Sequence, residues 1–274
     1  MVVRRLSILS ALVCSLAFAP AASAAYPAPY AVQGGAGVPG AHGTFHYVAL
    51  AWVGSRTRLE AVRDSTGLAA RKRLIPGSFG IPTLTQSGLA GGLSHDGRTL
   101  VLQSMGLADT SRFAIVRTRD LRLLRTVTLH GTFGYDALSP DGATLYLIQH
   151  TSAEDIQHYV VRAYDLRRHL LLPGRIADKT QANWLMQGWA VSRAETANGR
   201  WDYTLYANPG GYPFIHALDT VAGVAHCVGL PWMKPDQNPV WNFTLAVQGN
   251  AVLVKRADGS VWKRVNRTNW RLTN

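Results

Sequence analysis

The sequence predicts an all-β fold built from copies of one four-stranded unit. Residues 93–100 read LSHDGRTL, and residues 138–145 read LSPDGATL, 45 positions later. A second pair keeps the same spacing, because residues 116–122 read VRTRDLR and residues 161–167 read VRAYDLR. Two independent matches at one period indicate a duplicated unit. A unit of about 45 residues has the length of one four-stranded blade of a β-propeller.

Residues 1–24 have the pattern of a secretory signal peptide. Arg4 and Arg5 form a short basic start, residues 6–18 are almost wholly apolar, and residues 22–24 (Ala-Ser-Ala) are the small residues that cleavage requires. This apolar run is too short for a membrane span, and no later run is long enough to be a transmembrane segment. We therefore expect a mature chain that is secreted, or exported to a periplasmic or extracellular location.

The mature chain is strongly basic. Without residues 1–24 it keeps 26 basic and 16 acidic side chains, a formal charge of +10. Such a charge attracts acidic partners over long distances. The arginines are spread along the chain, and the densest clusters are only residues 71–73 and 167–168, so the pattern argues against nucleic acid as a partner. We expect a monomer that binds an acidic protein, peptide or cell-envelope polymer.

Cys227 is the only cysteine outside the signal peptide. An internal disulfide is therefore impossible, and stability must come from burial and from hydrogen bonds within sheets. His226 precedes Cys227, an arrangement that would suit an activated thiol. Adjacent residues of a strand point to opposite faces, however, so we interpret Cys227 as a buried structural thiol.

The chain changes character at residue 45. Residues 25–44 are rich in Pro, Gly and Ala, which is typical of a tether or an irregular strand laid on the body of the protein. Residues 45–274 form the predicted propeller domain, in which short segments rich in Val, Tyr and Trp alternate with polar turns. The first three predicted strands are residues 46–53, 57–63 and 70–75.

Each repeat has the same order of segments. An apolar strand ends at a Ser-x-Asp-Gly turn, and in the second copy three further strands follow at residues 144–148, 159–165 and 169–173. Asp accepts nearby backbone hydrogens in such a turn, and Gly adopts positive φ without steric cost. We therefore interpret the recurrent aspartates as turn residues rather than catalytic groups. They are Asp96 and Asp141 after the first strand, and Asp120, Asp165 and Asp219 after the third.

Five units are predicted. Weaker copies of the pattern surround Asn198-Gly199 and Gly249-Asn250, and residues 59–75 resemble residues 115–129. The unit that begins at Phe45 has no visible first strand, and residues 28–44 are the candidate source of it. The expected fold is a five-bladed β-propeller of four-stranded antiparallel blades.

A resemblance to known repeats supports this fold. The Ser-Pro-Asp-Gly turn at 139–142, followed by Thr-Leu-Tyr-Leu at 144–147, resembles the repeats of the TolB-like and YVTN propeller families and, more distantly, WD-repeats. Two units carry the resemblance well and the others loosely, over roughly residues 45–272. No Trp-Asp pair closes a third strand, and Tyr164 precedes Asp165. The resemblance implies a propeller whose innermost strands, those before the Asp-Gly turns, line a central channel, and it implies no particular activity.

In that geometry the two faces of the disc differ. The Asp-Gly turns on one face are short and uniform, whereas the loops that lead into the innermost strands on the other face are long and dissimilar: residues 77–90, 177–187 and 229–240. Long loops on a rigid base usually carry recognition. Aromatic rings beside amides and carboxylates suit sugars, peptides or similar partly apolar ligands. The candidate ligand-binding residues on this face are Asn183, Trp184, Trp189, Trp232, Asp236, Asn238 and Trp241, with Glu154 and Asp155 from the loop at 150–157.

The alternative for each Trp is a structural role, either capping the channel or wedged between blades. We expect a non-catalytic binding module and predict no catalytic residue, metal ligand or cofactor, because no serine nucleophile elbow or zinc-type spacing is present. The acids on the long-loop face also lie on loops, whereas catalytic groups need firm orientation. The alternative function is a propeller hydrolase acting on an ester, lactone or glycan, with or without a metal.

Overall fold

The computed structural model describes residues 30–106, 108–178, 180, 184–208, 211–231 and 239–274. Within these residues the fold is all-β, with five antiparallel sheets of four or five strands, as the sequence predicts. A short 3₁₀ helix covers Pro239–Asn242. In the part of the chain that is described, no helix has the length and apolar character needed to span a bilayer.

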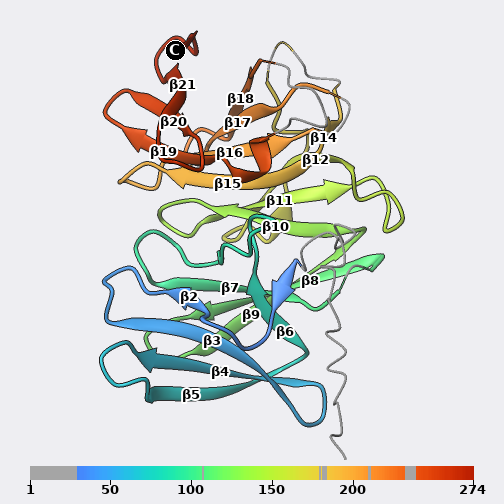
Figure 1. Ribbon diagram of the computed structural model, residues 1–274. Helices are drawn as coiled ribbons and strands as arrows, with labels where there is room; N and C mark the ends of the chain where they lie inside the picture. Colours follow the sequence, from blue (N-terminus) through green and yellow to red (C-terminus); the bar gives the residue numbers. More distant parts are fainter. Residues whose placement is uncertain (1–29, 107, 179, 181–183, 209–210, 232–238) are drawn as a thin grey trace, which may run out of the picture.

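The sheets follow one another in chain order, from the first at the bottom of Figure 1 to the fifth at the top. The first sheet contains β2 (Val38–Pro39), β3 (Phe45–Trp52), β4 (Arg56–Arg63) and β5 (Ala69–Pro76). The second contains β6 (Phe79–Pro82), β7 (Thr99–Ser104), β8 (Thr110–Arg117) and β9 (Arg122–His130), with β1 (Ala31–Val32) beside β6.

The remaining sheets repeat this order. The third contains β10 (Phe133–Leu138), β11 (Thr144–His150), β12 (His158–Asp165) and β13 (Leu170–Leu171), with β14 (Met186–Gln187) also paired to β12. The fourth contains β15 (Trp189–Glu195), β16 (Trp201–Ala207), β17 (Phe214–Asp219) and β18 (Val224–Gly229). The fifth contains β19 (Thr244–Gln248), β20 (Ala251–Lys255), β21 (Val261–Asn266) and β22 (Leu272–Thr273).

The first sheet takes its innermost strand from the segment before residue 45. In β2, Val38 pairs with Tyr47 and Pro39 with His46 of β3. The source proposed for the missing strand is therefore confirmed. Two short strands were not predicted, β1 beside β6 and β14 beside β12, and neither shows a repeat signal or a run of alternating residues long enough to indicate a strand.

The predicted Ser-x-Asp-Gly turns have one geometry in successive sheets. The Ser94 hydroxyl donates to the Asp96 carboxylate at 2.6 Å, and the Ser139 hydroxyl donates to Asp141 at 2.7 Å. Each serine oxygen then accepts the backbone N–H of the first residue of the second strand, at 2.9 Å in both copies. The glycines that follow have φ of 69° and 68°. The interpretation of these aspartates as turn residues is confirmed.

The fourth sheet makes the same turn with different side chains. The Thr196 hydroxyl contacts the Asn198 amide oxygen at 2.8 Å, and the Thr196 oxygen accepts the Trp201 N–H at 3.0 Å. Gly199 has φ of 68°. The pair Thr and Asn therefore replaces Ser and Asp without changing the turn.

The aspartates after the third strands also hold turns. Asp165 accepts the backbone N–H groups of Arg167 and Arg168, both at 2.8 Å, and Asp219 accepts those of two residues that follow it. Asp120 accepts the N–H of residue 122, although it lies three residues beyond the end of β8. These contacts show a structural role for all three carboxylates.

A second recurrent motif, missed in the sequence, joins one sheet to the next. Residues 77–80 read GSFG and residues 131–134 read GTFG, each at the start of an innermost strand. In both copies the backbone N–H of the Phe donates to a hydroxyl near the start of the third strand of the preceding sheet. Phe79 donates to Thr57 of β4 at 2.7 Å, and Phe133 donates to Ser111 of β8 at 2.8 Å. The motif escaped notice because its spacing of 54 residues differs from the period of the Asp-Gly turns.

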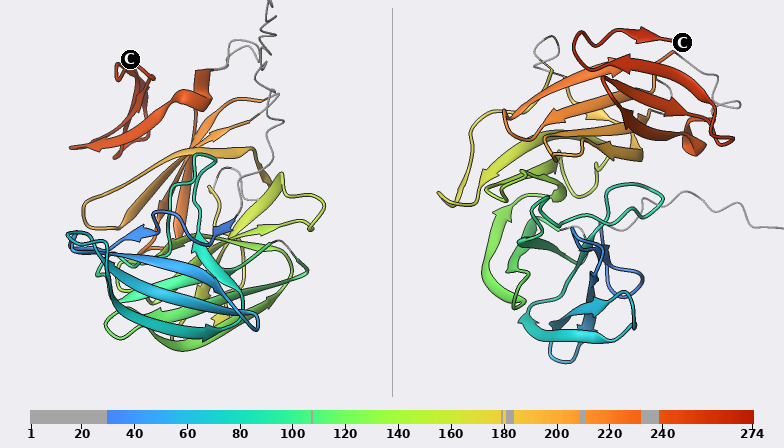
Figure 2. Two further views of the ribbon diagram at one scale, coloured as in Figure 1. Left: turned by 60° about the horizontal axis from the view of Figure 1, so that its bottom comes forward. Right: turned by 90° about the vertical axis from the view of Figure 1, so that its left-hand side faces the viewer.

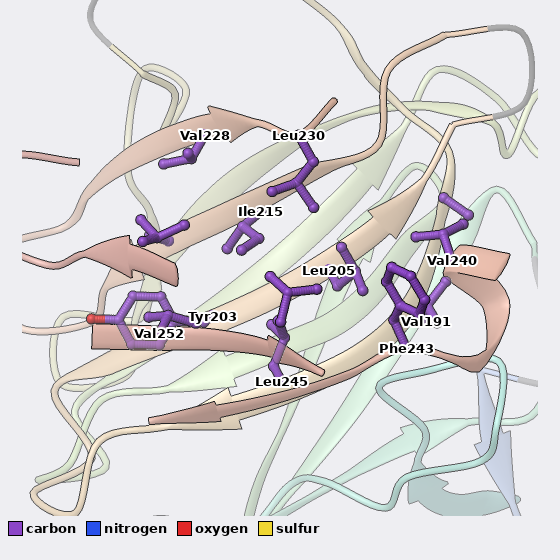
Figure 3. Packing of buried hydrophobic residues seen from close by; sticks show 14 residues of the cluster. Val191, Tyr203, Leu205, Ile215, Val228, Leu230, Val240, Phe243, Leu245 and Val252 are labelled. Carbon is purple, nitrogen blue, oxygen red and sulfur yellow. The ribbon is translucent and has the colours of Figure 1, made fainter. Parts of the chain in front are cut away.

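Buried apolar residues fill the space between consecutive sheets. Four clusters join the first sheet to the second, the second to the third, the third to the fourth and the fourth to the fifth. Figure 3 shows the last of these, in which Leu205 and Ile215 of the fourth sheet face Leu245 and Val252 of the fifth.

The two end sheets are not joined in this way. Among the described residues, no buried cluster is shared by the first and fifth sheets, and the views in Figure 2 place them at opposite ends of an arc. Each end sheet therefore packs a buried core on one face only.

Gly142 tests the turn geometry. Its φ is 68°, and a Cβ added to it would lie 3.0 Å from the Thr99 hydroxyl oxygen. We expect Gly142→Val to lower the free energy of unfolding by about 2 kcal/mol, because a β-branched residue resists this conformation. Urea denaturation measures the loss. Gly229→Val is the control, since this glycine of β18 has no positive φ and an added Cβ would meet nothing within 4 Å. Equal stability of the two variants would contradict the turn assignment.

Candidate functional site

The centre of the arc is crossed by the loop between β6 and β7. The backbone N–H of Gln86 in this loop donates to the carbonyl of Ala190 in β15, at 2.8 Å. The loop thus bridges the second and fourth sheets. Two cavities lie beside it, and Leu84, Tyr135 and Asp136 line both of them.

The smaller cavity, here called the aromatic pocket, has a volume of about 60 Å³. It lies where the innermost strands begin and the second strands end, which is the long-loop face. Its walls come from the loop at 83–86, the third and fourth sheets and the segment before β1. Six ring-bearing side chains line it, namely Tyr30, Tyr135, His150, Tyr159, Trp189 and Tyr206.

His150 is the unusual member of the aromatic pocket. It is only 5% exposed, and neither ring nitrogen makes a hydrogen bond of good geometry with the residues that the structure describes. Its ring meets Tyr30 and Tyr159 edge-on, with centroids 5.3 and 5.8 Å away. Burial lowers the pKa of His150 to about 4, and the backbone of Ile156 and the Asp155 carboxylate offset this only in part. The imidazole is therefore neutral at physiological pH and has one donor and one acceptor to offer.

The phenols around His150 are neutral as well. Burial raises the pKa of Tyr30 to about 12, and it raises the pKa values of Tyr159 and Tyr206 further. The Tyr159 hydroxyl donates to the Gly188 carbonyl at 3.3 Å. Gly134 makes room for the Tyr30 ring, since a Cβ there would lie 3.0 Å from Tyr30 Cδ1. The aromatic pocket is thus built from rings that carry no charge at neutral pH.

The larger cavity opens on the opposite face, beside the Asp-Gly turns, and has a volume of about 480 Å³. We call it the turn-side cavity. Arg193 of β15 donates to Asp136 of β10 at 2.9 Å and to Asp202 of β16 at 2.8 Å, and all three side chains are less than a tenth exposed. Burial raises the pKa of Asp202 to about 6, although Arg193 opposes this. Glu195, paired in register with Asp202, adds an exposed carboxylate to the lining.

This buried ion group was missed in the sequence. Asp136 and Arg193 lie 57 residues apart, and each is a charged residue within an innermost strand. A charged residue on a strand predicted to line the channel was the available signal. The pairing of Asp136 with Arg193 cannot be read from one sequence, because the two residues lie on different sheets.

The predicted tryptophans have different surroundings. Trp189 begins β15 and lines the aromatic pocket. Trp184 packs edge-on against Phe214, with centroids 5.5 Å apart, beside the core between the third and fourth sheets. Trp241 lies in the 3₁₀ helix and is 43% exposed. It lines a third cavity, of about 320 Å³, together with part of the loop between β6 and β7.

Glu154 and Asp155 do not line the aromatic pocket. Glu154 is exposed in the loop between β11 and β12. Asp155 in the same loop holds it together by contacting the His158 ring at 2.9 Å. Asn183, Trp232, Asp236 and Asn238 lie outside the described residues. Among the described candidates, only Trp189 belongs to the aromatic pocket.

The thiol of Cys227 lies away from both cavities. It contacts the His216 ring at 3.5 Å, and burial raises its pKa to about 12, so it stays protonated. His226 stacks on Trp270 on the other face of the sheet, with centroids 4.4 Å apart. Cys227 is partly rather than fully buried, and its contact with His216 fits the structural role predicted from the sequence. In the described ranges no group of three or more His, Cys, Asp or Glu side chains is placed to hold a metal ion.

Comparisons with known proteins show the fold. No protein-family model matches the chain, and no curated protein matches it. Among solved structures, the chain is similar to the Cps50 (Swd1) β-propeller domain of Myceliophteria thermophila, with 14% identity over 88% of this chain and a TM-score of 0.50. The chain spans 65% of the length of that domain. This likeness supports a β-propeller fold and nothing more specific.

TolB structures are also among the matches. The TolB of Acinetobacter baumannii is 12% identical over 86% of this chain, which spans 54% of that protein, with a TM-score of 0.44. A TolB from Agrobacterium tumefaciens, described as putative, is 12% identical over 86% of this chain and 78% of its own, with a TM-score of 0.46.

The state of His150 can be tested through the pH dependence of stability. The pKa of His150 is about 4 in the folded chain and 6.5 in the unfolded chain. Between these two pH values the unfolded chain binds a proton at this residue and the folded chain does not. Between pH 7 and pH 4.5 this should lower the free energy of unfolding by about 2.5 kcal/mol. His150→Phe should lose that much less stability over the same range. Denaturation of both proteins at each pH measures the difference, and parallel losses would show that His150 is not a buried neutral imidazole.

Proposed function

We propose that this chain is an exported, non-catalytic binding module that holds part of a cell-envelope polymer, a peptide or a protein on its long-loop face. The signal-peptide pattern supports export, and the formal charge of +10 after its removal supports an acidic partner. The observation that carries the proposal is the aromatic pocket at the centre of that face. Rings around a small cavity with a few polar atoms are typical of sites that bind by contact rather than by covalent chemistry.

The pocket is suited to binding for two further reasons. Its walls come from sheets held by continuous strand pairing and buried cores, so ligand contacts need little ordering. Trp189 and Tyr30 are half-buried, so each ring has exposed surface that can contact a ligand. An aromatic side chain at such a position often contributes much of the binding free energy.

The second candidate function is a hydrolase, and the turn-side cavity favours it. Asp202 has its pKa raised to about 6 by burial, and Glu195 lies opposite it in the register. Two carboxyl groups with different environments are what an acid–base pair requires. Asp202 is also bound to Arg193, however, and a structural ion pair accounts for its burial without any catalysis.

A binding assay on the mature chain, residues 25–274, tests the proposal. The probes are solubilised cell-wall glycan strands, a lipoteichoic acid and a poly-glutamate peptide, measured by calorimetry. We expect at least one probe to bind, and Trp189→Ala to weaken that binding about tenfold or more. Trp52→Ala is the matched control, because Trp52 is 38% exposed in the first sheet, beneath Arg58, and should leave affinity unchanged.

Two results would count against the proposal. One is equal binding by the wild-type chain and Trp189→Ala. The other is hydrolysis of chromogenic esters or glycosides that Asp202→Asn abolishes and Trp189→Ala does not, which would establish the hydrolase instead.

A further inference from the structure

We propose that the aromatic pocket is a carbohydrate subsite, which accepts an uncharged hydroxyl- or acetamido-bearing arm of a sugar residue while the sugar ring lies against Trp189 and Tyr30. The inference rests on the proposed binding function and names the ligand class among those open to it.

The first argument is the unmet hydrogen bonding of His150. This side chain is 95% removed from solvent, and within the described chain neither ring nitrogen makes a hydrogen bond of good geometry, although the backbone of Ile156 lies close enough to raise the pKa. A buried polar atom without a well-formed hydrogen bond is costly, so the unmet hydrogen bonding of this ring indicates a place for a ligand group. A neutral imidazole offers one N–H donor and one nitrogen acceptor. A hydroxyl or an amide, each both donor and acceptor, is its natural complement.

The second argument is that, among the described residues, no unpaired charged side chain lines the pocket. The phenols stay protonated, and Asp136, the one charged residue in that lining, is paired with Arg193 at 2.9 Å. An ammonium or carboxylate entering this space would lose its hydration without gaining an unpaired counter-charge. The group that enters is therefore neutral, even if the rest of the ligand carries the acidic groups that a basic protein attracts.

The third argument is size. A volume of about 60 Å³ holds a few water-sized groups. A hydroxymethyl or an acetamido arm fits this space, whereas a whole pyranose ring does not. The ring must then rest at the mouth, where the half-buried Trp189 and Tyr30 present flat surfaces. The apolar C–H face of a sugar packs well on such rings.

Matched trisaccharides test this subsite. Chitotriose and its de-acetylated form, the glucosamine trimer, differ in whether the arm is a neutral acetamide or a cationic amine, and maltotriose, cellotriose and tri-galacturonate extend the set. Each is titrated into the mature chain, with tryptophan fluorescence and calorimetry as readouts. We expect at least one neutral trimer to bind and its charged counterpart to bind at least about tenfold more weakly.

Variants locate the binding. His150→Phe keeps a ring of similar size and removes both unpaired nitrogens, so it should weaken sugar binding about tenfold or more without lowering the thermal midpoint. His150→Gln keeps a donor and an acceptor and should retain part of the affinity. His216→Phe is the matched control, because His216 is 2% exposed and has an unpartnered Nε2 but does not line the pocket.

A measurement on the wild-type chain covers the case in which a variant does not fold. In a chain with isotope-labelled histidine rings, the NMR signals of His150 should move on addition of the neutral trimer, and those of His216 should not.

Different results would contradict the carbohydrate subsite and the proposed binding function. Sugar binding that His150→Phe leaves unchanged, or a preference for charged trimers, would overturn the subsite. Binding of a Ser- and Asn-rich peptide with none of the sugars would also overturn it, while leaving the binding module intact. If no probe of any class binds in a way that depends on Trp189, both proposals are wrong.

Discussion

A bond between a Ser or Thr hydroxyl and an Asp or Asn side chain, in the turn that leads into the second strand of three sheets, sets the pattern of this structure. The Ser139 oxygen donates to Asp141 and accepts the backbone N–H that starts the second strand, so one atom fixes both the turn and the direction of the chain beyond it. Because Ser94 and Thr196 do the same, three sheets emerge from equivalent turns. The positive φ of the glycine completes a turn that few other residues can make.

Local features of the fold were predictable, and contacts between sheets were not. The repeat at 93–100 and 138–145 predicted the sheets, their strand order and the role of Asp96 and Asp141. The strands β1 and β14 were missed because two residues carry no readable period. The aromatic pocket was missed because its residues come from separate parts of the chain. Tyr30, His150 and Trp189 are each ordinary in their own segments, and only the packing of separate sheets brings them to one cavity.

The two central cavities differ in their charged groups. The turn-side cavity holds a buried ion group, and the aromatic pocket is lined mainly by neutral rings. On the side of the Asp-Gly turns, Arg193 is held between two buried carboxylates. On the other side, a lowered pKa at His150 and raised pKa values at the phenols keep every ring neutral. Asp136 lines both cavities, and it is paired with Arg193. Arg193 thus supplies a counter-charge for the one acidic side chain in the described lining of the aromatic pocket.

The described residues of the first and fifth sheets share no buried core, and this gives the described fold the energetics of a linear array rather than of a closed circle. Each interior sheet gains from two neighbours, whereas each terminal sheet gains from one. Opening should therefore begin at β2–β5 and β19–β22, where amide protons exchange first, and reach the third sheet last. The aromatic pocket, set between the third and fourth sheets, occupies the segment that persists longest.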